Sequence, residues 1–284
     1  MKQLIVTADD FGLDRAVNEA VERAHRDGIL STASLMVGAP EAADAVRRAK
    51  LLPRLHVGLH LALVDAAPLL AGPAAAPLLR RSGEFDRNML RAGLRFFLLP
   101  RVRAALAAEI RAQFEAFAAT GLALDHVNAH KHMHIHPTLS RMIVAIGRDY
   151  GMRAVRVPAE PIGPLNRAWP AERHRAPFYT AWVERLRRRL EGEGLLVNDH
   201  LFGTAWSGGM VEERLLALIP QLPEGLSEIY LHPASERTPR LAALMPHYRH
   251  EAELAALLSP AVRARLAEEG VRLAGYGSLA ARSS

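Results

Sequence analysis

The sequence contains no cysteine among its 284 residues. This absence excludes a disulfide framework, a thiolate metal site and a cysteine nucleophile, so histidine and carboxylate side chains must carry any metal chemistry. The chain also lacks an apolar targeting segment near its start and any run of about 18 uncharged apolar residues. The sequence therefore predicts a cytoplasmic protein with neither a signal peptide nor a membrane-spanning helix.

Aromatic residues are scarce, at 6%, and the chain has no recognised nucleic-acid-binding motif. The net charge of +6 therefore does not predict a nucleic-acid partner. The positive charge is concentrated in residues 87–103, RNMLRAGLRFFLLPRVR, where five arginines and no acid surround a Leu/Phe core. Two interpretations stay open: an amphipathic helix packed on the protein, or a segment that contacts an anionic membrane. We expect one domain over residues 1–284, with a basic apolar insertion near 66–103.

Short β-rich runs alternate with amphipathic helical patterns along the whole chain. The predicted strands lie near residues 3–8, 32–37, 55–59, 123–127, 153–157, 194–198, 226–231 and 271–274. The predicted helices lie near residues 15–27, 41–50, 102–120, 138–150, 178–192, 211–219 and 260–269. This α/β pattern favours parallel strands covered by helices, and a single (β/α) barrel, distorted or incomplete, matches it best. A doubly wound open sheet is the alternative.

Several polar residues occur where the predicted strands end. They are Asp9 and Asp10 after the first strand, His60 after the third, His130, His132 and His134 after the fourth, Arg156 at the end of the fifth and His232 after the seventh. The carboxyl ends of barrel strands share one face, so these residues are expected to converge on a site. Each also has an ordinary explanation, since Asp10 or Asp14 could cap the following helix and a single histidine is usually structural.

Histidines are clustered around the fourth predicted strand. Five of the chain's 13 histidines lie between His126 and His136. Imidazole and carboxylate together suit a divalent metal, so the cluster favours a metal site over coincidence. A hydrolytic metal site with open positions uses about three protein ligands. Most of the cluster must therefore support the ligands or face a substrate.

Four motifs together resemble those of a known family, the YdjC-like carbohydrate deacetylases, which are relatives in fold of the polysaccharide deacetylases. The motifs are TADDFG at residues 7–12, HVGLHL at 56–61, HVNAHKHMH at 126–134 and LHPA at 231–234. They occur in the family's order and extend over most of the chain. Within the family, the sequence looks most similar to the branch associated with hopanoid biosynthesis. The resemblance implies removal of an acetyl group from an N-acetylglucosaminyl hopanoid lipid.

The resemblance also implies a role for each site residue. It places one divalent cation, Mg²⁺ or Zn²⁺, on Asp10, His60 and His130, and it makes Asp9 the catalytic base, His232 the proton donor and Arg156 the partner of Asp9. Two positions depart from the family's pattern, Asn128 in place of a carboxylate and Lys131 in place of a histidine. His132, His134 and Asn128 are then expected to support the ligands or to bind substrate.

Other functions stay open from the residues alone. The chain could instead be a chitooligosaccharide deacetylase, another metal hydrolase such as a phosphoesterase, or a non-enzymatic barrel that binds a glycolipid. A glycosidase is disfavoured, because Asp9 and Asp10 are adjacent and cannot flank a glycosidic bond. We expect an amino-sugar or glycolipid substrate and peripheral contact with the inner surface of an anionic membrane. The oligomeric state is not predicted.

Overall fold

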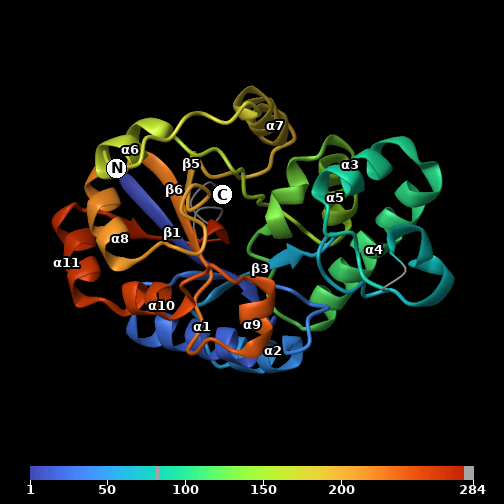
Figure 1. Ribbon diagram of the computed structural model, residues 1–284, viewed down its shortest axis with the longest axis horizontal. Coiled ribbons are helices and arrows are strands. Elements are labelled where there is room, and N and C mark those ends of the chain that lie inside the picture. Colours follow the sequence, from blue (N-terminus) through green and yellow to red (C-terminus); the bar gives the residue numbers. More distant parts are fainter. Residues whose placement is uncertain (81–82, 278–284) are drawn as a thin grey trace.

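A parallel sheet forms the centre of the protein in a computed structural model that describes residues 1–80 and 83–277 (Figure 1). Residues 81–82 of the predicted insertion lie outside the described residues. The strands are β1 (Lys2–Phe11), β2 (Thr32–Leu35), β3 (His56–Leu61), β4 (Val127–Ala129), β5 (His200–Phe202), β6 (Gly225–Leu231) and β7 (Arg272–Leu273). Their order is β4-β3-β2-β1-β6-β5, and β7 also pairs with β1.

The sheet curls into a distorted, incomplete barrel. Single parallel bridges join Val127 to Val155 and Ala154 to Leu196, so that the pairing continues from β4 toward the segment that leads into β5. The neighbours thus follow chain order around a ring, whereas a doubly wound sheet reverses its order at a switch point. The prediction of a (β/α) barrel, distorted or incomplete, is confirmed.

The strands predicted at 153–157 and 194–198 are wrong as regular strands, because Ala154, Val155 and Leu196 form only isolated bridges. Backbone hydrogen bonds join Val155 N to Leu196 O at 3.0 Å and Leu196 N to Arg153 O at 2.9 Å, but at Val157 a side chain replaces this pairing. The Asn198 amide accepts a hydrogen bond from Val157 N at 2.7 Å and donates one to Val157 O at 2.9 Å. Backbone polar groups must be satisfied when buried, and here the asparagine satisfies them without a strand.

The helices surround the strands (Figure 1). They are α1 (Arg15–Asp27), α2 (Ala42–Lys50), α3 (Met89–Leu98), α4 (Pro100–Ala119), α5 (Pro137–Asp149), α6 (Ile162–Ala168), α7 (Thr180–Gly192), α8 (Glu212–Leu218), α9 (Pro239–Leu244), α10 (His250–Leu258) and α11 (Pro260–Glu268). At the start of α1, the Asp14 carboxylate accepts a hydrogen bond from Ala16 N at 2.9 Å. Asp14 is therefore the N-cap, which leaves Asp10 free for another role.

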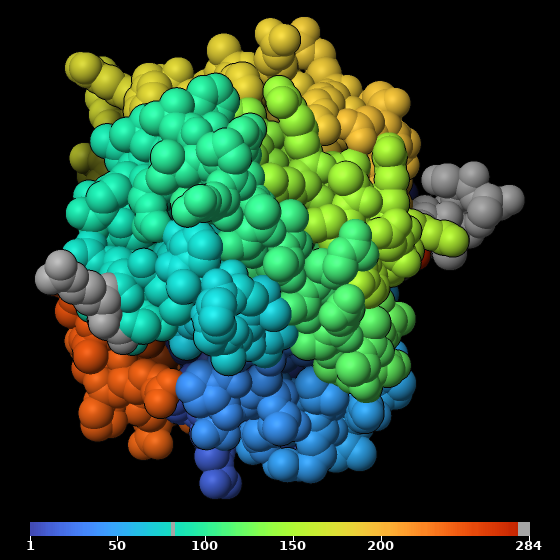
Figure 2. All heavy atoms as spheres, turned by 90° about the vertical axis from the view of Figure 1, so that its right-hand side faces the viewer, coloured from blue at the N-terminus to red at the C-terminus, as the bar shows by residue number. Residues whose placement is uncertain are grey.

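Helix α3 and the start of α4 lie in the basic apolar segment at residues 87–103. Together with α5, these two helices cover much of the face seen in Figure 2. Ala92 and Phe96 of α3 are buried, so one face of this helix packs on the protein, as the first interpretation predicts. Other apolar side chains of the same segment face outward: Met89, Leu90, Leu94, Phe97, Leu98 and Leu99. None of the helices in residues 1–80 and 83–277 is long and apolar enough to cross a membrane.

Candidate metal centre and catalytic pocket

Asp9 and Asp10 lie inside β1, and the prediction that they follow the strand is wrong. The register of β1 against β2 shifts between Ala8 and Phe11, which marks a β-bulge. Asp10 has a φ of 61°, a left-handed conformation that aspartate tolerates better than most residues. A bulge re-aims side chains near an active site. Here it allows two adjacent buried carboxylates to meet different partners.

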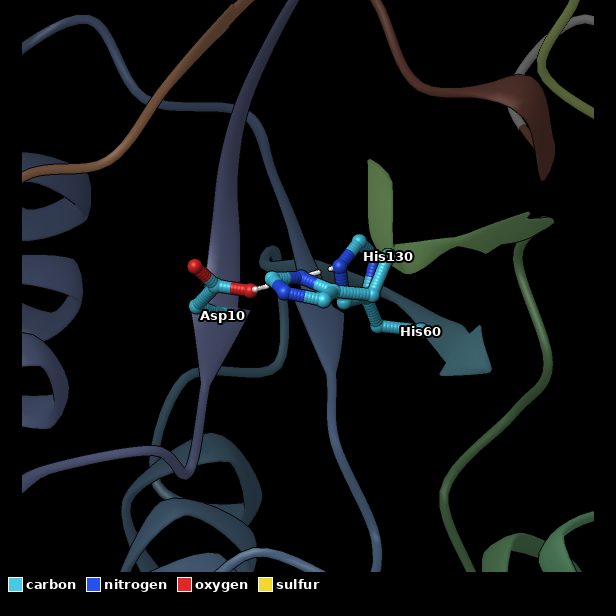
Figure 3. Close-up of side chains that lie close together, drawn as sticks. All are labelled: Asp10, His60 and His130. Atoms are coloured by element: carbon cyan, nitrogen blue, oxygen red, sulfur yellow. Dashed lines mark hydrogen bonds and ion pairs between the residues drawn. The ribbon is translucent and has the colours of Figure 1, made fainter. Parts of the chain in front are cut away.

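Asp10, His60 and His130 form a compact cluster (Figure 3). They come from β1, from β3 and from the residue directly after β4. The Asp10 Oδ1 atom lies 3.3 Å from His60 Nε2 and 3.2 Å from His130 Nδ1. One donor atom from each residue lies within 4.8 Å of the other two. The structure thus brings together the three residues that the resemblance assigned to a metal.

The donor atoms of this cluster fit a divalent cation. His60 Nδ1 is 2.6 Å from the Asn128 Oδ1 atom, which can only accept, so Nδ1 carries the proton and Nε2 offers a lone pair. The Asp10 Oδ2 atom is buried and has no hydrogen-bond partner in the part of the chain that the structure describes. Two imidazole nitrogens and a carboxylate are ligands that Zn²⁺ and related metals accept.

Burial and mutual contacts set the pKa values of Asp10 and His60 in this cluster. Burial alone would raise the pKa of Asp10, but His130 and His60 hold it well below its ordinary range. Burial opposes the charged form of His60, yet the Asp9 charge and the contact with Asp10 raise its pKa. A cation in the cluster would therefore compete with a proton for His60.

Asp9 faces a second cation, the guanidinium of Arg156. Arg156 Nη1 donates to Asp9 Oδ2 at 2.6 Å, and Nη2 donates to Asp9 Oδ1 at 3.0 Å. On the other side, Arg156 donates to Glu228 Oε1 at 2.7 and 3.0 Å. Burial works to raise the pKa of Asp9, but Arg156 and His60 hold it far below its usual value. Asp9 is therefore ionised at neutral pH.

His232 follows β6, as predicted, and lines the same pocket as Asp9 and Asp10. Two groups fix its backbone: His232 N donates to Glu253 Oε2 at 2.6 Å, and His250 Nδ1 donates to His232 O at 2.6 Å. Burial lowers the pKa of His232, against the opposing charges of Asp10 and Asp9. The His232 imidazole is therefore neutral at neutral pH before any reaction begins.

The remaining predicted residues occupy different places. His132 lines the pocket, and its Nε2 atom is 3.2 Å from the Tyr230 hydroxyl. His134 is buried behind the pocket and donates from Nε2 to the Arg156 carbonyl at 2.9 Å, so it supports Arg156 and does not face substrate. Asn128 joins His60 to Asp9, to which its Nδ2 atom donates at 3.2 Å.

These side chains open into one pocket of about 870 Å³. Its wall contains Asp9, Asp10, His60, His130, His132 and His232. Aliphatic side chains form another part of the wall, among them Leu13, Met36, Leu69 and Leu244. A volume of this size accommodates a ligand larger than a single sugar ring.

Sequence reasoning missed two residues of this region, Glu228 and Tyr230, both in β6. Glu228 is fully buried beside Arg156, and the Arg156 guanidinium lies 5.0 Å from the centre of the Tyr230 ring. One signal was available: Glu228 is a charged residue in the middle of the otherwise strand-like GLSEIYL. A charge in a buried strand requires a partner, and Arg156 was the candidate.

The fold and the cluster define an incomplete (β/α) barrel with an Asp-His-His group at the carboxyl ends of its strands. Residues 3–268 match the model of the YdjC-like protein family, and the chain belongs to this family. The chain is 30% identical over 273 residues to a carbohydrate deacetylase of Geobacillus stearothermophilus, and the match covers 96% of each chain. It is 25% identical to a carbohydrate deacetylase of Thermoanaerobacter pseudethanolicus, with 98% of this chain and all of the relative covered.

A solved structure supports the fold independently. A protein of Enterococcus faecalis, described as a cellobiose-phosphate cleavage protein, superimposes with a TM-score of 0.75 and 23% identity. The superposition covers 98% of both chains. The predicted family and the predicted relation to hydrolases of the deacetylase class are thus confirmed, whereas the branch within the family is a matter for proposal.

Proposed function

We propose that this protein is a metal-dependent N-deacetylase that hydrolyses the acetamide of an N-acetylated amino sugar. One observation carries the proposal: Asp10, His60 and His130 form a cluster that fits a cation, and Asp9 and His232 line the same pocket. Relatives that this chain matches over 96% or more of their length are named carbohydrate deacetylases, which supports the same reaction. The products are acetate and a free amino sugar.

The protein's residues divide the proton transfers of this reaction. A divalent cation, when bound to the cluster, would acidify a water molecule and polarise the acetyl carbonyl. Asp9 accepts the proton of the attacking water, and Arg156 keeps Asp9 ionised until then. The amine leaves only when protonated, and His232 delivers that proton. Because His232 is neutral at rest, it first takes up a proton from solvent, and Asp9 later returns the proton of the water to solvent, so that the proton count is unchanged over the reaction.

For the substrate, we propose an amino sugar that carries an apolar group, of which an N-acetylglucosaminyl hopanoid is one. Aliphatic residues make up much of the pocket wall outside the polar cluster, including Met36, Leu69 and Leu244. Burial of an apolar group against such a wall is favourable by about 25 cal/mol per Å². A free chitooligosaccharide would gain little from this wall.

We further propose that residues 87–103, here called the α3–α4 corner, contact the inner surface of an anionic membrane and that the protein is cytoplasmic. The exposed fractions are 75% for Leu90, 57% for Phe97 and 62% for Leu98, which is high for apolar residues in one segment. The arginines differ: Arg87 and Arg91 pair with Asp65 and Asp86, whereas the exposed Arg101 and Arg103 form none of the ion pairs found among the described residues.

The corner is also next to the pocket. Met89 and Arg87 line the pocket wall and belong to the exposed segment. A headgroup that projects from a bilayer under this corner would therefore lie near the pocket mouth. Apolar side chains flanked by arginines are typical of surfaces that bind anionic lipid.

Acetate release tests the reaction. Purified protein is stripped of metal, divalent cations are added back one at a time, and acetate is measured from N-acetylglucosaminyl lipids and from chitooligosaccharides. We expect metal-dependent acetate release, fastest with a lipid-linked sugar. Phosphate release from phosphorylated sugars without acetate would instead indicate a phosphoesterase. Cation binding without turnover of any acetylated sugar would indicate a binding protein.

Vesicle flotation tests the membrane contact separately. The variant replaces Leu90, Phe97 and Leu98 with Ser and leaves the buried Phe96 in place, so that packing is retained. Wild type should float with vesicles that contain anionic lipid, less at high salt, and the variant should not. Equal flotation of both, or of neither, refutes the membrane contact and leaves the deacetylase proposal intact. Vesicle-independent self-association of wild type alone would assign the corner to a second copy of the chain.

A further inference from the structure

A continuous chain of buried hydrogen bonds leads from the proposed metal site through the barrel interior. His60 Nδ1 contacts Asn128 Oδ1 at 2.6 Å, and Asn128 Nδ2 contacts Ser34 Oγ at 2.9 Å. Ser34 Oγ lies 3.1 Å from His126 Nε2, and His126 Nδ1 lies 3.0 Å from Asp125 Oδ2. Four of these side chains are at most 2% exposed, and Asp125 is 9% exposed.

The direction of every hydrogen bond in this chain is determined by its two ends. Asp125 is ionised, because His126 and His56 lower its pKa against the effect of burial, and an ionised carboxylate can only accept. In its neutral form His126 must then donate from Nδ1, which leaves Nε2 as an acceptor for the Ser34 hydroxyl proton. With its proton committed to His126, Ser34 accepts from Asn128 Nδ2.

The contact of Asn128 with Asp9 imposes the same direction on the Asn128 amide. Asn128 Nδ2 also donates to Asp9 Oδ1, a second atom that can only accept. Both contacts turn the Asn128 amide so that its oxygen faces His60 Nδ1. A reversed amide would place an NH₂ group there and force the His60 proton onto Nε2, toward Asp10. His60 could not then offer Nε2 to a cation.

The surrounding backbone leaves room for this series of hydrogen bonds and anchors its far end. The register places Gly58 of β3 opposite Ser34 of β2. A Cβ atom at Gly58 would lie 2.3 Å from His126 Cε1, so only glycine leaves room for the His126 ring. The far end is equally anchored, because Asp125 Oδ1 accepts from Gly277 N at 2.7 Å and lies 3.1 Å from His56 Nδ1.

From this arrangement we propose that Ser34, His126 and Asp125 are positioning residues for the metal site. They act through Asn128, whose amide must point one way, and they thereby set the His60 tautomer that can bind a cation. Outer partners of metal-binding histidines commonly change metal affinity by about 10- to 100-fold. The inference rests on the proposed metal site, and its test separates the two.

The test compares Ser34→Ala with Ser227→Ala. Ser227 is also a buried strand serine, but its hydroxyl has no hydrogen-bond partner in the described part of the chain, which makes it a matched control. Zn²⁺ and Co²⁺ affinities are measured by calorimetry at fixed pH, with thermal unfolding as a check of the fold. We expect Ser34→Ala to weaken binding by about 10- to 100-fold and Ser227→Ala to leave it near wild type.

Imidazole ¹⁵N spectra of the metal-free protein provide a second readout, which does not depend on catalysis. In wild type above the pKa of His60, we expect His60 and His126 as the Nδ1–H tautomers, and we expect Ser34→Ala to shift the His126 Nε2 resonance and to mix the His60 tautomers. An Nε2–H tautomer of His60 in wild type, or equal affinities of the two serine variants, overturns the inference. A wild type that binds no cation overturns the proposed function instead, and the spectra then decide the tautomer question alone.

If Ser34→Ala does not fold, Asp125→Asn makes the same test from the far end. Asparagine has nearly the shape of aspartate but removes the negative charge that sets the direction of the hydrogen bonds from Asp125 to His60. Weaker cation binding and a mixed His126 tautomer are expected. An unchanged His126 tautomer in Asp125→Asn overturns the inference.

Discussion

The buried guanidinium of Arg156 offers the most quantitative test of the site's electrostatics. It is fully buried between two carboxylates, those of Asp9 and Glu228, with donor–acceptor distances of 2.6 to 3.0 Å. Arg156→Met keeps much of the side-chain volume but removes the charge. Two buried carboxylates then remain without a cation. Breaking a buried ion pair on one side costs about 3–5 kcal/mol.

The size of the loss should depend on pH. In wild type the Asp9 pKa is held below its unfolded value of 3.8, so its ion pair stabilises the fold above that pH and stops doing so as the pH falls through the folded pKa. In Arg156→Met, Asp9 loses the guanidinium that lowers its pKa and is protonated more easily. The difference between the two proteins should therefore shrink as the pH is lowered from 7 toward 4.

Urea unfolding followed by tryptophan fluorescence measures these differences at each pH. Arg148→Met is the control, since Arg148 pairs with Glu193 at 3.1 Å on the surface and its side chain is 54% exposed. Exposed pairs contribute about 0–1 kcal/mol. A second substitution, Glu228→Gln, should recover part of the loss in Arg156→Met by removing one unpaired charge. The reasoning is refuted if Arg156→Met costs no more than Arg148→Met, or if Glu228→Gln adds to the loss.

Three further predictions concern the site itself. Asp10→Ala should lose bound metal, whereas Asp9→Asn should keep the metal and lose turnover. Elemental analysis of both variants measures the bound metal, and equal metal loss would contradict the separate roles of the two acids. His232→Ala should slow acetate release by about 10²-fold or more with the fold intact, and an unchanged rate would return His232 to a structural role. Metal affinity should fall as the pH drops below the raised pKa of His60, because the cation must displace a proton, and an affinity by calorimetry that stays constant over this pH range would refute the prediction.

The convergence of Asp10, His60 and His130 on one face could be predicted from the strand topology, whereas their choice as a metal set came from the family resemblance. Each residue lies at the carboxyl end of a parallel strand, and neighbouring parallel strands bring such ends together. The strand order β4-β3-β2-β1 places the three strands in one continuous stretch of sheet. This prediction does not require exact strand boundaries, so the difference between the predicted strand at 123–127 and β4 at Val127–Ala129 does not affect it.

The chain of Ser34, His126 and Asp125 could not be predicted, because it depends on contacts between strands. A serine in TASL carries no signal in the sequence, and its partner Asn128 lies 94 residues away. The same holds for Asn198, whose amide replaces a strand ladder at Val157. Side chains that substitute for backbone pairing leave no periodic pattern that could reveal them.

The pair Asp9 and Asp10 shows how local backbone geometry separates two identical side chains. In a regular strand they would point to opposite faces, and only one could reach the pocket. The bulge and the left-handed Asp10 residue let both line the pocket, but with different partners. Asp9 receives donors from Arg156 and Asn128 on its two oxygens, whereas Asp10 keeps Oδ2 without a partner among the described residues. A carboxylate with an open oxygen suits a cation, so one backbone distortion gives the two acids the different surroundings that their proposed roles as metal ligand and base require.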